Sequence, residues 1–168
     1  MEDGDKAENV GKLGDLIAGI KVAMLTTVDA SGTMRSRPMG TLDADFTGDL
    51  WFFTSKNSGK SDELQSDSRV NVSYAAPDKN RYVSVTGTAR VVHDRHMVEE
   101  LWSPAHKAWF PKGLDDPDLG LIKVEVESAE YWDSPSGTVT QIIGLVKALA
   151  TGQRAEVGEH ERVELNKD

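Results

Sequence analysis

Hydrophobic and polar residues alternate along much of the chain, which is the pattern of strands that bury one face. Turn signals rich in Asp, Asn, Gly and Pro separate these stretches, and the second stretch is expected to return antiparallel to the first after the turn at residues 29–32. A further stretch is a continuous apolar and aromatic run, which is typical of a buried strand. The predicted strands are Lys21–Val28, Thr33–Met39, Leu50–Phe53, Arg69–Ala76, Arg81–Val92 and Leu121–Val126, the last continued by Ala129–Trp132.

Apolar residues spaced three or four apart predict amphipathic helices at three places. They recur from Val10 to Ile20, after the candidate N-cap Asp94, and from Val139 to Leu149. About six short strands with few, peripheral helices predict a mainly β fold, an antiparallel barrel that is closed or partly closed.

Three features indicate how the strands are arranged. Pro38 cannot donate a hydrogen bond to a neighbouring strand, so its strand lies at an edge of the sheet or contains a break. Gly87 has no side chain to pack and predicts a bulge or a close approach of another backbone. Asp43–Asp49 is interpreted as a polar hairpin connection that leads into the aromatic strand.

The chain of 168 residues fits a single domain with a sizeable core, and it contains no internal repeat and no linker. We expect this domain to span residues 1–152. Gln153–Asp168 has mixed charges and no apolar period, so we expect a mobile C-terminal tail that contributes little to the core.

Composition narrows the classes of function. The net charge of −9 argues against binding to a nucleic-acid backbone or docking on anionic lipid, because both need basic patches. The chain has no cysteine, which excludes disulfides and thiol chemistry. No apolar run reaches transmembrane length and the acidic N-terminus does not resemble a signal peptide, so we expect a cytoplasmic protein without a membrane partner.

The stretch Leu50–Leu64 holds the strongest candidate for binding chemistry. A polar loop separates the aromatic strand from a short helix that opens near Lys60, and the start of a helix offers free N–H groups and a positive dipole end. The hydroxyl of Ser58 and the ammonium of Lys60 would seat a phosphate there. The alternative is that Ser58 only caps the helix and Lys60 only faces solvent.

Two arginines add to this candidate site. Arg35 and Arg37 lie two residues apart on one strand and therefore point the same way, either as a solvated edge or as the charged floor of an anion site. Together with Ser58 and Lys60 they suit a flat, phosphorylated cofactor, and flavin mononucleotide (FMN) fits that description. The histidines suggest no metal site, because the one close pair lacks an obvious third ligand.

The segment Arg35–Met39, followed by Trp51–Thr54 and the loop at Lys60, resembles the pyridoxamine 5′-phosphate oxidase-like family. The later segment Tyr131–Pro135, with the helix that contains Ile142 and Ile143, is similar to the general stress protein branch of that family. The resemblance covers roughly residues 10 to 150, with the elements in the same order.

The resemblance implies an FMN-binding split β-barrel that forms a homodimer with flavin at the subunit interface. By the pattern of the family, the strand residues Arg35, Ser36, Arg37, Pro38 and Met39 run along the flavin. Phe53 and Thr54 lie near its ring and ribityl chain, and Ser58 and Lys60 hold its phosphate.

The chain departs from the oxidases proper in two respects. Gly59 stands where they often carry an arginine before the lysine, which leaves one cation fewer. The chain after Trp132 lacks the arginine-and-histidine motif that grips the pyridoxal substrate, so we expect no oxidation of vitamin B6.

Two functions stay open at this point. The first is a flavin-dependent oxidoreductase of stress-response type that acts with NAD(P)H or a small-molecule substrate. The second is a non-enzymatic flavin protein that serves as a sensor or carrier, and a deazaflavin or haem site on the same barrel is a third, minor alternative. The sequence identifies no catalytic acid or base.

Overall fold

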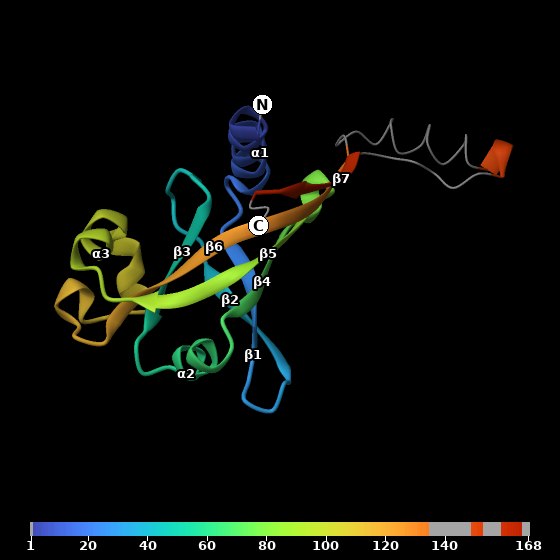
Figure 1. The fold of residues 1–168 in the computed structure, drawn as a ribbon. Helices are drawn as coiled ribbons and strands as arrows, with labels where there is room; N and C mark the ends of the chain where they lie inside the picture. Colours follow the sequence, from blue (N-terminus) through green and yellow to red (C-terminus); the bar gives the residue numbers. More distant parts are fainter. Residues whose placement is uncertain (1, 135–148, 153–158, 166–168) are drawn as a thin grey trace.

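The computed structural model describes residues 2–134, 149–152 and 159–165. Within these residues, a single antiparallel sheet has the strand order β2-β1-β4-β5-β6-β3, and β7 adds to β6 beside that path (Figure 1). The strands are β1 (Val22–Val28), β2 (Met34–Gly40), β3 (Asp49–Ser55), β4 (Arg69–Ala76), β5 (Arg81–Val92), β6 (Leu119–Asp133) and β7 (Glu159–Glu164).

The sheet curls so that its two end strands, β2 and β3, come near each other without a backbone ladder between them in the described residues. The protein is therefore an antiparallel split β-barrel with peripheral helices, which confirms the predicted fold class. The helices are α1 (Glu2–Ile17), α2 (Gly59–Ser66) and α3 (Arg95–Leu101), and the short 3₁₀ turns are η1 (Pro77–Lys79), η2 (Pro104–Ala108) and η3 (Gly113–Asp115).

Two hydrophobic clusters hold these elements together. The larger fills the barrel between the inner faces of the strands and includes Leu13 and Leu16 of α1 and Leu64 of α2. In Figure 1, α1 and α2 lie at opposite ends of the sheet. The smaller cluster lies under α3, where Phe53 and Leu121 project from the other face of β3 and β6. Alternate residues of β3 and β6 therefore pack into two different cores, one on each face of the sheet.

Local backbone predictions are confirmed at three positions. Pro38 lies in β2, which is an edge strand of the sheet. The pairing of β5 with β6 shifts register between Thr86 and Gly87, and a Cβ added to Gly87 would lie 2.1 Å from the carbonyl oxygen of Glu125. Only glycine fits so close to another backbone. Asp94 caps α3, and its carboxylate accepts from the backbone N–H of Met97 at 3.1 Å.

The connection at Asp43–Asp49 is not a hairpin, because β3 pairs antiparallel with β6 and not with β2. The loop character of this segment was predicted correctly, but the partner of the strand that follows it was not. The predicted helix from Val139 to Leu149 lies outside the described residues except for Leu149, whose side chain is exposed.

The prediction that residues 153–168 contribute little to the core is wrong for the part that the structure describes. β7 pairs antiparallel with residues 128–133 of β6. Val163 and Leu165 are buried in the main cluster, and Leu165 donates its backbone N–H to the carbonyl of Glu127 at 2.7 Å. These two apolar residues alternate with charged ones, and two positions are too few to produce a visible period.

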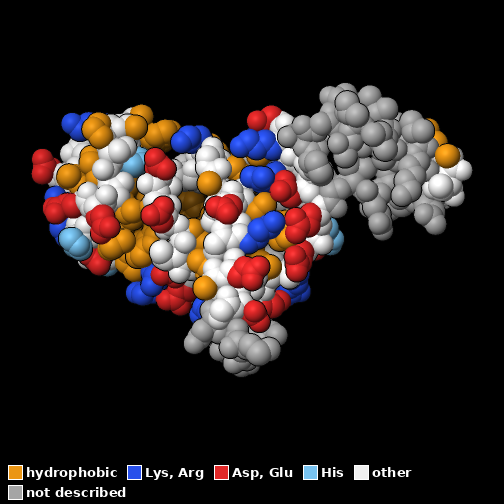
Figure 2. All heavy atoms as spheres, turned by 90° about the horizontal axis from the view of Figure 1, so that it is seen from above, with side chains coloured by type: hydrophobic (Ala, Val, Ile, Leu, Met, Phe, Trp, Pro, Cys, Tyr) orange, Lys and Arg blue, Asp and Glu red, His pale blue; other side chains and the backbone are white. Residues whose placement is uncertain are grey.

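Charge is spread over the surface in keeping with the acidic composition. Figure 2 views the molecule from the side on which α1 lies, and acidic side chains occur across this face with separate basic side chains among them. The described part of the chain holds no helix that is long and apolar enough to cross a membrane.

Leu165→Ala should destabilise the protein by about 2–5 kcal/mol, because it removes a buried side chain and leaves a cavity where β7 meets the barrel. Denaturant unfolding of the two proteins at pH 7 measures the difference. Arg162→Ala, three residues earlier on β7, is the control, since its exposed side chain should contribute at most about 0.5 kcal/mol. Equal stability of Leu165→Ala and the unaltered protein would mean that β7 is not docked in solution.

Candidate functional site

The β1–β2 hairpin sorts the predicted site residues onto two faces. Arg35 and Arg37 stand opposite Thr27 and Leu25, which are fully buried, so both arginines belong to the inner face. The residues between them belong to the outer face: the hydroxyl of Ser36 lies 2.5 Å from that of Thr26, and Pro38 is exposed. Met39 returns to the inner face and packs in the main core.

A buried carboxylate gathers the inner-face arginines. Arg37 donates to Glu63 at 2.8 Å and to the hydroxyl of Thr27 at 2.5 Å, and Thr27 in turn donates to Glu63. Arg35 reaches the other carboxylate oxygen of Glu63 at 3.5 Å from a more exposed position. Because Glu63 belongs to α2, this network ties the helix to β1 and β2.

Hydrogen bonds outweigh burial at Glu63. The bonds from Thr27 and Arg37 hold the pKa of its carboxyl below the usual value of 4.5, although burial alone would raise it. Glu63 is therefore ionised at neutral pH and neutralises Arg37.

Three hydroxyl groups lie together where α2 begins. The Ser58 hydroxyl lies 3.4 Å from that of Thr54, at the end of β3, and 3.4 Å from that of Ser61 in the first turn of the helix. Ser58 occupies the N-cap position, yet its side chain makes no capping hydrogen bond. Thr54 and Ser61 are buried. The interpretation of Ser58 as a simple cap is therefore wrong, and its hydroxyl lies in a polar recess at the start of the helix.

Lys60 adds a positive charge to the first turn of the same helix. Among the described residues, no carboxylate lies within 4.0 Å of its ammonium group, whereas Arg37 is close enough to repel it. Partial burial and this repulsion lower the pKa of Lys60, and Glu63 acts in the opposite direction. An anion placed here would relieve the repulsion between the two cations.

The loop between β3 and α2 is anchored by the residue that precedes β6. The carboxylate of Asp118 accepts from the hydroxyl of Ser55 and from the backbone and side-chain N–H groups of Asn57, at 3.1 Å and 2.9 Å. Lys56 donates its ammonium to the carbonyl of Pro117 at 3.1 Å. These bonds fix the approach of the chain to Ser58.

Phe53 does not lie with the other site residues. Its ring packs against His106 at 4.8 Å, Trp102 at 5.6 Å and Phe110 at 6.2 Å, and only 8% of the residue is exposed. Burial lowers the pKa of His106, so this imidazole is neutral at pH 7 and serves the packing under α3. Within the described residues, no group of three or more His, Asp or Glu could hold a metal ion.

The structure thus brings together part of the predicted set. Arg37, Thr54, Ser58 and Lys60 meet around the start of α2, with Arg35 at the margin; Ser36 and Pro38 lie on the outer face, and Met39 and Phe53 in the two cores. Thr27, Glu63 and Asp118 belong to the site but were not predicted from the sequence. Glu63 follows Lys60 by three positions, a spacing that places both on one face of a helix and could have indicated that Glu63 lies at the site.

The fold and the recess define a class: a split β-barrel with a hydroxyl-lined helix start beside its first hairpin. Residues 8–156 match the family model described as pyridoxamine 5′-phosphate oxidase like. The chain belongs to this family.

Two relatives carry the comparison further. Protein bli-3 of Neurospora crassa is 32% identical over 162 residues, which cover 90% of this chain and 78% of that protein. General stress protein 26 of Bacillus subtilis is 29% identical over 130 residues, which cover 76% of this chain and 90% of that protein.

Solved structures share the fold. One, described as a general stress protein 26 of Jannaschia sp. CCS1, superposes with a TM-score of 0.73 at 25% identity, covering 94% of this chain and 99% of that one. Another, described as the general stress FMN/FAD binding protein of Xanthomonas citri, has a TM-score of 0.65 at 29% identity, covering 76% of this chain and 89% of that one.

Glu63→Gln should destabilise the protein by about 1.5–3 kcal/mol at pH 7, because it weakens charged hydrogen bonds and leaves Arg37 without its counter-charge. The pKa of Glu63 is lowered in the folded state, so its stabilising effect is complete above pH 4.5 and fades as the pH falls below that value. The difference between the two proteins should therefore shrink as the pH falls from about 5 through 4.5 and below.

Urea unfolding across this pH range provides the measurement. Asp62→Asn, which removes an exposed carboxylate from the same helix, is the control and should change stability by at most about 0.5 kcal/mol. A cost of Glu63→Gln that does not vary with pH would show that the carboxylate is not held as an ion.

Proposed function

We propose that this protein binds flavin mononucleotide, with the phosphate group at the start of α2. The observation that carries the proposal is the recess in which Ser58 and Thr54 present hydroxyl groups at the start of α2, the helix that carries Lys60 in its first turn. Ser58 makes no cap, so its hydroxyl and the free N–H groups of the first turn are available to an anion.

The charges of the recess favour a phosphate monoester. Lys60 has no acidic partner among the described residues, while Glu63 engages Arg37. A phosphate would take hydrogen bonds from the hydroxyls and face the lysine, and Arg37 would support it at longer range. FMN ends in such a phosphate, and FAD does not.

Relatives support the choice of a flavin. The structure from Xanthomonas citri, described as FMN/FAD binding, shares 29% of its residues with this chain, and the family model spans the β1–β2 hairpin and α2. We propose that this chain also binds a flavin, because it has residues of its own that suit the flavin phosphate.

We further propose that the bound flavin serves redox chemistry and accepts a hydride from NADH or NADPH. The flavin would supply the redox chemistry, and the protein would hold its phosphate and exclude water from its ring. A sensor or carrier is the competing function, and it would bind flavin without rapid reduction by either nicotinamide.

We also propose that the protein is a homodimer. The outer face of β2, β1, β4 and β5 is left bare by the described helices, and it exposes Val22, Met24 and Tyr82. In the register of the sheet, Met24 stands beside Pro38 on one side and Ser73 on the other, so an apolar centre is surrounded by small and polar residues. Stable interfaces have this arrangement of a hydrophobic centre and a polar rim.

Lys60→Ala should weaken the binding of FMN about tenfold or more and leave riboflavin nearly unchanged, since the two ligands differ only in the phosphate. The remaining affinity should also depend less on salt. Titrating both ligands against both proteins gives the four dissociation constants that are needed.

Lys79→Ala is the matched control for this titration. It removes an equal charge from an exposed lysine in the η1 turn, at the end of β4 away from α2. If Lys60→Ala keeps the full preference for FMN over riboflavin, Lys60 does not hold the phosphate and the proposed site is refuted.

Met24→Glu should convert the dimer into monomers, because it places a charge at the centre of the exposed apolar face. Sedimentation at micromolar concentration gives the mass of each protein. Trp109→Glu is the control, as it makes the same kind of change at an exposed position beside the smaller core, and it should remain a dimer. A monomeric unaltered protein would contradict the proposal outright.

A further inference from the structure

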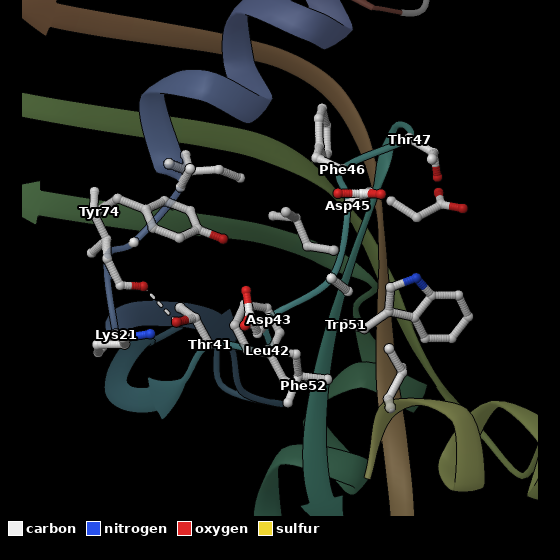
Figure 3. A pocket seen from close by; sticks show the side chains of 18 of the residues that line it. Lys21, Thr41, Leu42, Asp43, Asp45, Phe46, Thr47, Trp51, Phe52 and Tyr74 are labelled. Atoms are coloured by element: carbon white, nitrogen blue, oxygen red, sulfur yellow. Dashed lines mark hydrogen bonds between the residues drawn. The ribbon is translucent and has the colours of Figure 1, made fainter. Parts of the chain in front are cut away.

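A pocket of about 670 Å³ lies at the other end of the barrel from the recess at α2. It opens between the end of α1, the loop that joins β2 to β3, and the first half of β3 (Figure 3). Its volume falls within the range of small-molecule sites. None of the residues that form the recess lines this pocket, so an occupant of it would be separate from the proposed flavin phosphate.

One polar group inside the pocket has no partner. Tyr74 projects from β4, and only 4% of the residue is exposed. Its hydroxyl forms no hydrogen bond within the part of the chain that the structure describes, and Figure 3 shows this hydroxyl directed into the pocket, where solvent reaches it. Burial raises the pKa of Tyr74, so the group remains a neutral donor at all physiological pH values.

The hydroxyl oxygen keeps contact with solvent inside the pocket, because every fully buried side-chain N or O atom of the described residues has a hydrogen-bond partner. A ligand that enters the pocket would therefore replace water at this hydroxyl and take over its hydrogen bond. Leu50, Phe52 and Ile20 form apolar walls around the same space. The combination favours a ligand with a flat or cyclic apolar body and one polar group that meets Tyr74.

The charged residues at the rim of the pocket indicate that the ligand is a cation. Asp43 and Asp45 lie on the loop after β2, are exposed, and make no ion pair with any residue in the described ranges. Of the other lining acids, Asp49 is paired with Lys123 at 3.2 Å. Lys21 is the cation that lines the pocket, so unpaired carboxylates exceed it.

We propose that this pocket binds a small organic cation: a primary amine on an aromatic body that carries a hydroxyl group. The amine faces Asp43 and Asp45, the ring lies against the apolar walls, and the hydroxyl bonds to Tyr74. The net charge of −9 favours the approach of a cation over that of an anion.

Three related compounds test each part of the proposal. Tyramine has the amine, the ring and the hydroxyl; phenethylamine lacks the hydroxyl; and 4-hydroxyphenylacetate replaces the amine with a carboxylate. Calorimetric titration of the full chain should rank tyramine first and 4-hydroxyphenylacetate last. Failure of all three to bind with a dissociation constant below about 10 mM would overturn the proposal.

Variants assign the contacts. Tyr74→Phe should lower the affinity for tyramine about three- to tenfold and leave phenethylamine unchanged. Tyr82→Phe, which removes a hydroxyl from the exposed outer face, is the control and should change neither. Equal effects of Tyr74→Phe on both amines, or none on either, would overturn the role of the hydroxyl.

The double variant Asp43→Asn/Asp45→Asn should weaken both amines about two- to fivefold and strengthen 4-hydroxyphenylacetate. Asp62→Asn/Asp78→Asn makes the same change in net charge away from the pocket and should have little effect. Unchanged amine affinity in the first double variant would overturn the role of the rim. Lys60→Ala should leave all three compounds unaffected, so this test is independent of flavin binding.

Discussion

The ion pair between Glu63 and Arg37 is the contact on which the proposed site depends. It joins α2 to the β1–β2 hairpin, and Thr27 completes it from the strand between them. A partly buried pair of this kind is costly to break, because the remaining charge would be left without a partner. Its geometry therefore fixes where α2 starts, and with it the positions of Ser58 and Lys60. Asp118 fixes the other side of the same loop.

This pair also changes the charge that an anion would meet. A count of cations in the sequence gives Arg35, Arg37 and Lys60 as equal partners for a phosphate. In the structure Glu63 neutralises Arg37 and reaches Arg35 as well, so Lys60 is the cation of the three that forms no ion pair in the described residues. Gly59, where the oxidases proper often carry an arginine, adds no further cation to the site. The site would thus depend on a single strong charge supported by hydroxyl groups, and its affinity would respond strongly to the charge state of the ligand.

Short-range patterns in the sequence predicted well what they determine physically. The alternation of the strands, the bulge at Gly87, the edge position of Pro38 and the cap at Asp94 each follow from the chemistry of a few neighbouring residues, and the structure contains all of them. The pairing of strands that are distant in the sequence was harder to predict. The run Leu50–Phe53 predicted a buried strand, but apolar residues on both faces carry no sign of which face meets which core. Phe52 enters the barrel and Phe53 the cluster under α3, so the predicted place of Phe53 beside a flavin ring has no support in its packing.

The lack of pairing between β2 and β3 explains both the recess at α2 and the pocket at the opposite end of the barrel. In the described residues β3 pairs with β6 alone, so the chain must cross from one edge of the sheet to the other through residues 41–48. That crossing replaces a backbone ladder with a loop, and side chains from β3, β4 and α1 line the space beneath it. Tyr74 would be an ordinary core residue in a closed barrel, where a neighbouring strand would cover its ring and a polar group would have to meet its hydroxyl. Because β2 and β3 do not pair, the ring is covered while the hydroxyl faces open space. The unpaired edges of β2 and β3 therefore have two consequences. At one end of the barrel they leave the β1–β2 hairpin free to contact α2, and at the other end they leave a pocket with the Tyr74 hydroxyl inside it and carboxylates at its rim.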